Sequence, residues 1–180
     1  MDYGISQVNP MAWYIVWKRP DGVLWILDEF YKRPCMPKEV AEWVNAQRTI
    51  WDSRRKLMGC YGCPRTFQKE KDGRTPAQYL NSDHGIVVSQ HPVHFEVRYP
   101  IVFQALNDKR IKISEKCTNL IAELQSLTWE TKDTGADHAI EALERGAVKA
   151  LGHSNFVVDT AAINKNAPPT IMGNMLSRNF

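Results

Sequence analysis

The chain has 180 residues with a formal net charge of +3 at neutral pH, and 43% of its residues are hydrophobic and 24% charged. This composition fits one globular domain, and the length is short for two. The longest apolar runs, such as residues 11–17, are too short to span a bilayer, and the N-terminal residues show no secretory signal pattern. We therefore expect a cytoplasmic protein without membrane association, whose four cysteines are reduced thiols: Cys35, Cys60, Cys63 and Cys117.

The net charge alone does not indicate a nucleic-acid-binding protein, but the charges are unevenly distributed. Basic residues gather between positions 48 and 74, at Arg48, Arg54, Arg55, Lys56, Arg65, Lys69, Lys71 and Arg74. Such a stretch can bind the phosphates of a nucleic acid. A solvated helix face and loop would have the same composition, so charge alone leaves both interpretations open.

The first third of the chain predicts a β-hairpin followed by a helix. Residues 11–18 and 23–31 are rich in aromatic and β-branched residues, and Pro20-Asp21-Gly22 between them is a turn signal. Residues 1–4 resemble the end of an earlier strand, which is either a stub or part of a longer protein, and we favour the longer protein. Apolar residues at helical spacing predict a helix over residues 38–57.

The rest of the chain alternates short strands with helices. The predicted elements are a strand within residues 58–67, a loop at 68–75, a helix at 76–82, a strand at 86–88, a helix at 100–107, a strand at 110–113, and helices at 114–128 and 137–151. Thr75 is a suitable N-cap and Gly85 a suitable stop for the helix between them. Pro92 and Pro100 argue against a continuous helix across residues 90–100. The order indicates an α/β fold with a mixed sheet and helices on both faces.

Three carboxylates and a histidine are candidates for a metal site. Asp137 and Glu141 are four residues apart, which puts them on one face of the predicted helix, with His138 beside the first. Asp2 is followed by Gly4, which lets the backbone turn close to a ligand. Carboxylates bind Mg²⁺ or Mn²⁺, and two such ions about 3.5–4 Å apart can hydrolyse a phosphodiester. Paired acids are also common on exposed helix faces, and Asp137 at a helix N-terminus is equally suited to capping.

Four segments of the chain share their order and spacing with one known family. They are Asp2-Tyr3-Gly4 followed by Asn9-Pro10, then Leu27-Asp28-Glu29-Phe30-Tyr31, then residues 113–129, and finally Asp137-His138-Ala139-Ile140-Glu141-Ala142-Leu143. In these segments the sequence resembles the C-terminal nuclease domain of the large terminase subunit of tailed phages. The resemblance implies an RNase H-like fold over residues 1–151, with an antiparallel hairpin and parallel strands in one mixed sheet flanked by helices. Residues 152–180 would then be a tail that is disordered or becomes ordered on binding.

The resemblance also implies a function. Domains of this family are metal-dependent endonucleases that cut concatemeric viral DNA during packaging in the host cytoplasm, with Mg²⁺ or Mn²⁺ as cofactor. Their partners are double-stranded DNA, an ATPase motor domain and the portal protein. Asp2, Asp137 and Glu141 would be catalytic and metal-binding here, with His138 supporting the metal and Glu141 replacing the usual aspartate. The DNA backbone would contact Arg54, Arg55, Lys56, Arg65, Lys69, Lys71 and Arg74.

One position departs from the family pattern. Gly62-Cys63-Pro64 is the best match to the strand end that normally carries the middle metal-binding aspartate, which places Cys63 at that position. A thiol is a poor ligand for Mg²⁺, so a catalytically impaired DNA-binding or docking module of the packaging motor is the alternative function. Glu29 has two interpretations as well: it approaches the metal, or it faces solvent or a lysine.

Cys60 and Cys63 also form a Cys-x-x-Cys motif. It can be half of a zinc site, a redox pair, or two small buried residues at a strand end. His91 and His94 follow in an irregular stretch, where they can contact a phosphate or metal or be exposed. A zinc-stabilised interaction domain is therefore a third hypothesis for the function.

Overall fold

The N-terminal part of the fold is an antiparallel hairpin. The computed structural model describes residues 10–52, 59–91, 93–127 and 137–152. Strand β1 (Met11–Lys18) pairs with β2 (Leu24–Lys32). The turn between them places Gly22 at a φ of 82°, a conformation that favours glycine. The predicted hairpin is confirmed.

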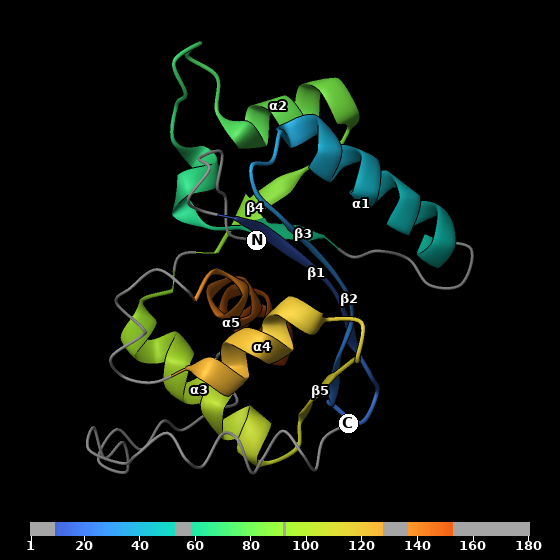
Figure 1. Cartoon of the computed structure of the whole chain (residues 1–180), viewed down its shortest axis with the longest axis vertical. Coiled ribbons are helices and arrows are strands. Elements are labelled where there is room, and N and C mark those ends of the chain that lie inside the picture. Colours follow the sequence, from blue (N-terminus) through green and yellow to red (C-terminus); the bar gives the residue numbers. More distant parts are fainter. Residues whose placement is uncertain (1–9, 53–58, 92, 128–136, 153–180) are drawn as a thin grey trace.

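The strands form two small sheets. Strand β5 (Ile111–Ile113) adds parallel to β2, which gives a mixed sheet in the order β1-β2-β5. Strand β3 (Cys60–Gly62) pairs in parallel with β4 (Val88–Gln90) in the second sheet. Figure 1 shows β3 and β4 beside the hairpin, on the side of β1. The predicted mixed α/β architecture with flanking helices is therefore confirmed, but the described strands form two sheets and not the single mixed sheet that was predicted.

Helices α1 (Pro37–Asp52) and α2 (Pro76–His84) pack together next to the second sheet. The predicted caps of α2 are confirmed: the Thr75 hydroxyl accepts a bond from the N–H of Gln78, and Gly85 ends the helix at a φ of 65°. A short 3₁₀ helix, η1 (Pro64–Phe67), follows β3. The predicted continuation of α1 to residue 57 lies outside the described residues.

Three further helices cover the other side of the hairpin (Figure 1). They are α3 (Phe95–Asn107), α4 (Thr118–Ser126) and α5 (His138–Leu151). Helix α5 packs on β1 and also contacts β2, β3, α3 and α4, so it lies at the centre of the described structure. None of the described helices combines the length and apolar character needed to cross a membrane.

Two apolar cores result from this arrangement. One lies between β2, β5 and helices α3 to α5, and its fully buried members include Leu24, Ile26, Ile101, Ile111, Leu120, Leu143 and Leu151. The other lies between β1, the second sheet and helices α1 and α2, with Met11, Trp13, Val40, Cys63, Leu80 and Ile86 among its members. The hairpin thus contributes side chains to both cores.

The helix predicted at residues 100–107 begins earlier than expected, although it does not extend across the whole of residues 90–100. Helix α3 begins at Phe95 and runs through Pro100. Proline at this position removes the backbone bond to the carbonyl of Glu96, in the first turns of the helix. The buried side chain of Ile101 and the ion pairs of Arg98 with α5 offset that loss.

Two other boundaries also differ. Helix α4 begins at Thr118 rather than 114, because residues 114–117 form a turn in which the N–H of Cys117 donates to the carbonyl of Ser114. Strand β4 begins two residues later than predicted, at Val88. Ile86 is buried although it precedes the strand. The apolar residues 86–88 therefore indicate burial in the core, and they do not define where the strand begins.

Candidate functional site

The first turn of α5 carries the acidic motif. Asp137 occupies the N-cap position, and its backbone carbonyl accepts a bond from the N–H of Glu141 at 2.8 Å. The side chain of Asp137 makes no capping bond to the helix. Asp2 lies outside the described residues. Within the described part of the chain, no three His, Cys, Asp or Glu side chains are grouped closely enough to hold a metal ion.

Glu141 lies between two guanidinium groups. Its Oε1 is 3.5 Å from Nη2 of Arg98, and its Oε2 is 3.9 Å from Nη2 of Arg145. The Glu141 side chain is 32% exposed, whereas Arg98 and Arg145 are buried. Two arginine side chains therefore balance the negative charge of Glu141, a role that the sequence analysis gives to a bound metal ion.

Arg98 is held by more than Glu141. Its Nε donates to Oε2 of Glu144 at 3.2 Å, and its Nη1 donates to the carbonyl of Val93 at 3.0 Å. Glu144 is itself buried on α5. A buried charge is tolerated when it is paired and hydrogen-bonded in this way. The network therefore links the first turn of α3 to the face of α5 that carries Glu141.

The N-terminus of α5 is capped by a carboxylate from another helix. Glu123 on α4 accepts bonds from the N–H groups of Ala139 and Ile140 at 2.8 and 3.2 Å, and from the hydroxyl of Tyr31 at 2.8 Å. Burial raises the pKa of Glu123, and these hydrogen bonds oppose the shift. Glu123 thus performs the capping that the position of Asp137 suggests.

Glu29 caps the N-terminus of α4 in the same way, so the interpretation that it only faces solvent or a lysine is wrong. One carboxylate oxygen accepts bonds from the backbone N–H and side-chain amide of Asn119, at 2.7 and 2.8 Å. The other accepts from the N–H of Leu120 at 3.1 Å. Glu29 therefore caps a helix, and both of its carboxylate oxygens accept hydrogen bonds from α4.

Cys63, which the resemblance to the terminase family places at the position of the middle acid, is a core residue. It follows β3, is 2% exposed, and places its Sγ 3.5 Å from Oγ1 of Thr66. Its neighbour Cys60 is half-buried, and burial raises the pKa of that thiol. All four cysteines are free thiols. The burial of Cys63 favours the interpretation of two small residues at a strand end.

The two histidines of the irregular stretch have different positions. His94 is exposed at the N-cap position of α3. The ring of His91 lies edge-on to the ring of Tyr61, with 6.4 Å between their centroids. His138, on the first turn of α5, has its Nε2 buried.

The predicted DNA-contacting residues fall into three groups. Arg65, Lys69 and Lys71 are exposed along η1 and the loop after it. Arg74 is half-buried, 2.8 Å from Oδ1 of Asp83 and 4.8 Å from the ring centre of Tyr79, so it anchors the loop to α2. The remaining candidates, Arg54, Arg55 and Lys56, lie outside the described residues.

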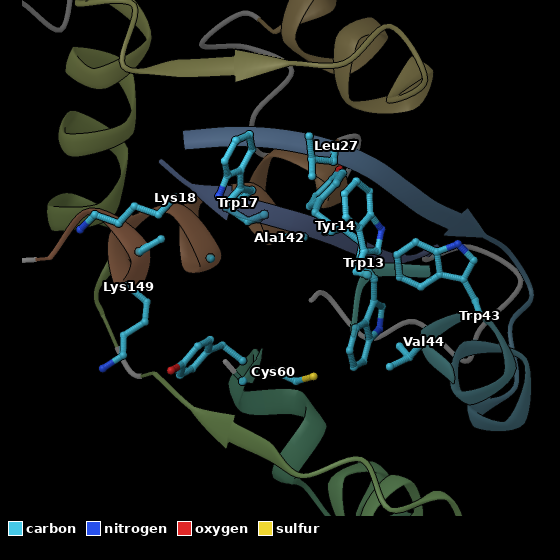
Figure 2. Close-up of a pocket in the computed structure, with 17 residues that line it drawn as sticks. Trp13, Tyr14, Trp17, Lys18, Leu27, Trp43, Val44, Cys60, Ala142 and Lys149 are labelled. Carbon is cyan, nitrogen blue, oxygen red and sulfur yellow. The ribbon is translucent and has the colours of Figure 1, made fainter. Parts of the chain in front are cut away.

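A groove of about 410 Å³ separates β1 from β3 (Figure 2). It is mainly aromatic and aliphatic, and α5 contributes Ala142, Gly146, Lys149 and Ala150 to its lining. Sequence reasoning missed this groove, because its walls come from segments more than forty residues apart along the chain. The spacing of the small residues on α5 was the only local signal.

Comparisons with protein-family models, with curated proteins and with solved structures find no match to this chain. The chemistry of the site therefore rests on its own residues. The described side chains offer a partly exposed carboxylate, Glu141, beside two guanidinium groups, and a separate exposed row of cations.

Proposed function

We propose that this chain is the RNase H-like nuclease domain of a phage DNA-packaging terminase, a metal-dependent endonuclease that cuts concatemeric viral DNA. The observation that carries the proposal is the position of α5. This helix bears the Asp137-to-Leu143 motif on its first turns and packs against both β1 and β3. The hairpin and the parallel strand pair supply the two kinds of strand pairing that the proposed fold requires.

The residues present suit Mg²⁺ or Mn²⁺ in part. Glu141 offers a partly exposed carboxylate, and hard divalent ions accept carboxylate oxygens together with water and substrate phosphate. Asp2 and Asp137 would complete the ligand set, with His138 beside them. The ions would supply an activated water and would stabilise the leaving oxygen. Arg98 and Arg145 hold the Glu141 carboxylate and limit its freedom to turn.

Exposed cations support contact with double-stranded DNA. Arg65, Lys69 and Lys71 lie together along η1 and the following loop. Lysine and arginine contacts of this kind bind phosphates and do not read bases. In the proposed role, this surface holds the duplex while an ATPase motor domain and the portal protein move it.

Plasmid nicking with Mg²⁺ or Mn²⁺ tests the proposal. Wild type is compared with Asp2→Ala, Asp137→Asn and Glu141→Gln, and with Glu42→Gln on the exposed side of α1 as matched control. We expect cleavage by wild type and by the control, with a loss of at least about 10²-fold in the Glu141 and Asp2 variants. Equal cleavage by all five proteins would contradict the assignment.

A non-cleaving DNA-binding or docking module of the packaging motor is the second candidate. Two observations favour it: Glu141 is paired with Arg98 and Arg145, and a buried thiol, Cys63, stands where the family has an acid. In this case wild type binds DNA in a salt-dependent manner without nicking it. Replacing Lys69 and Lys71 by glutamine should then weaken binding and flatten its salt dependence.

A further inference from the structure

The loop between η1 and α2, residues 68–74, lies between two firmly held elements. Before it, η1 carries the buried Thr66 and packs Phe67 against the core beside α1 and α2. After it, α2 begins behind the capping box of Thr75, and η1 and α2 contact each other. Figure 1 shows the loop at the outer end of the structure, beside α2 and away from α3 to α5.

A tight backbone turn lies within this loop. The N–H of Gly73 donates to the carbonyl of Glu70, and the N–H of Glu70 donates to the carbonyl of Arg74, both at 2.9 Å. Gly73 has a φ of 82°, a conformation that favours glycine. Oδ1 of Asp72 accepts a bond from the N–H of Arg74 at 3.0 Å. These bonds fix the shape of the turn, and Arg74 stands where the turn meets α2.

The guanidinium group of Arg74 joins the turn to α2. Its Nη2 donates to Oγ of Ser82 at 2.6 Å and to Oδ1 of Asp83 at 2.8 Å, and its Cζ lies 4.8 Å from the centre of the Tyr79 ring. The hydrogen bond from Arg74 lowers the pKa of Asp83, so this carboxyl stays charged at neutral pH. The ion pair is neutral as a whole, and Arg74 therefore adds little to the positive potential around the loop.

The neighbouring cations are placed differently. Arg65, Lys69 and Lys71 are exposed, and none of them makes an ion pair with another described residue. A lysine side chain is long and flexible, so the place of its ammonium group depends on how firmly the backbone is held. If the loop were loose, binding a phosphate through Lys69 or Lys71 would also cost the entropy of ordering it.

We propose that Arg74 is a positioning residue for DNA binding, which pairs with Asp83 and thereby holds the 68–74 loop with Lys69 and Lys71 toward the phosphates of the duplex. The inference rests on the proposed function, because its ligand is double-stranded DNA. It differs from the sequence prediction, in which Arg74 itself contacts the DNA backbone. It also gives an acid, Asp83, a favourable effect on the binding of a polyanion, which is the opposite of the effect of its charge.

Two acids of the same surface give the sharpest test. Glu70→Ala and Asp83→Ala each remove one negative charge, and by charge alone both should tighten the binding of DNA. Glu70 is an exposed residue of the turn, and alanine keeps its backbone bonds. We expect Glu70→Ala to bind a labelled duplex of about 20 base pairs as tightly as wild type or up to about twofold more tightly, and Asp83→Ala to bind it at least about fivefold more weakly. Fluorescence anisotropy of the whole chain in EDTA measures both.

Salt dependence separates positioning from direct contact. Each phosphate contact adds about −0.9 to the slope of log K against log salt concentration. Lys71→Gln should therefore reduce the size of the slope by about one. We expect Arg74→Gln to weaken binding at every salt concentration and to leave the slope unchanged, because both lysines still reach their phosphates in the complex and only the cost of ordering the loop has risen.

Trypsin measures the order of the loop without DNA. It cleaves after exposed lysine and arginine residues, and Lys69 and Lys71 lie within the loop. Cleavage after these lysines should be several-fold faster in Arg74→Gln and Asp83→Ala than in wild type and Glu70→Ala. Circular dichroism verifies that all variants are folded, so that a general loss of structure is distinguished from a loosened loop.

The results distinguish failure of this inference from failure of the proposed function. If wild type does not bind the duplex, both are wrong. If wild type binds it and Asp83→Ala binds it equally well or more tightly, the positioning role alone is wrong. Equal reductions of the salt slope in Arg74→Gln and Lys71→Gln would assign Arg74 to a phosphate contact. Unchanged cleavage by trypsin in Asp83→Ala would mean that the ion pair does not hold the loop.

Discussion

Arg98 and Glu144 form an ion pair inside the protein, with 3.2 Å between Nε and Oε2 and side chains that are 5% and 3% exposed. The pair joins α3 to α5, and the same arginine reaches Glu141 with its Nη2 atom. The carboxylate that sequence analysis selects as a metal ligand is therefore held by an ionic network that also orders the fold.

Removing one member of this pair should destabilise the protein strongly. Arg98→Met leaves Glu144 buried without its main partner, which costs about 3–5 kcal/mol in comparable cases. The double variant Arg98→Met/Glu144→Leu removes both charges and should recover most of that loss. Urea unfolding followed by circular dichroism measures the free energy of unfolding for each protein.

An exposed ion pair provides the control for this experiment. Lys38 and Glu42 lie 3.8 Å apart on α1, with side chains that are 71% and 64% exposed. Lys38→Met should change the free energy of unfolding by no more than about 0.5 kcal/mol. A similar loss in Arg98→Met and Lys38→Met would mean that burial of the Arg98 pair contributes little.

Replacing Glu29 should weaken α4 and leave chemistry intact. Its carboxylate accepts from the backbone N–H groups of Asn119 and Leu120, so Glu29→Ala should cost about 1–2 kcal/mol of stability, as for loss of a helix cap. Glu42→Ala on the exposed face of α1 is the control. Plasmid cleavage per folded molecule should be unchanged. A stable Glu29→Ala protein without cleavage would instead assign this residue to the metal site.

Local signals in the sequence predict the elements but not the contacts between them. The hairpin follows from its β-rich runs and the turn at Gly22, and α2 follows from Thr75 and Gly85, because each signal acts within a few residues. Pro100 shows the limit of the same reasoning. Its local cost is real, but contacts of Ile101 and Arg98 with distant segments exceed it.

In the candidate site, too, the sequence predicts the elements but not the contacts between them. Periodicity places Glu141 on α5, but it cannot show that Arg98, 43 residues away, binds it. Glu29 caps a helix 90 residues away, and Glu123 caps α5 from another helix. No local pattern distinguishes such acids from surface charges. The sequence also does not predict the burial of Glu144 and Arg145, because charged residues are expected at the surface unless a partner is known.

Stability should depend on pH through Glu123. Burial raises the pKa of this carboxyl in the folded protein above its unfolded value of about 4.3. The group therefore contributes stability that is complete below pH 4.3, and that contribution is lost as pH rises through the folded pKa. The free energy of unfolding of wild type, measured relative to Glu123→Gln, should fall between pH 4 and pH 7. A constant or rising difference would show that the hydrogen bonds to Tyr31, Ala139 and Ile140 outweigh burial.

The four thiols should react in an order set by exposure and pKa. Burial raises the pKa of Cys35 to about 11, and burial with the charges of Glu29 and Asp28 raises that of Cys117 to about 12. Cys60 is the least buried of the four. Iodoacetamide at pH 8 should modify Cys60 first, and peptide mass spectrometry identifies the site. Faster reaction at Cys117, or a Cys60–Cys63 disulfide formed in air, would contradict this order.

Introducing the missing acid should create a metal-dependent stability. Cys63 is 2% exposed beside Thr66 in an apolar core, so Cys63→Asp buries a carboxylate at a cost of about 3 kcal/mol. If this position belongs to a metal site with Glu141, Mn²⁺ should restore much of the loss, because a ligand at 100 times its Kd contributes about 2.7 kcal/mol. Cys117→Asp is the matched control: Cys117 is fully buried at the N-cap position of α4, and the stability lost in this variant should not be restored by Mn²⁺. Thermal unfolding with and without Mn²⁺ measures both proteins. If Mn²⁺ changes the thermal stability of both variants equally, Cys63 does not belong to a metal site, and the non-cleaving module is favoured.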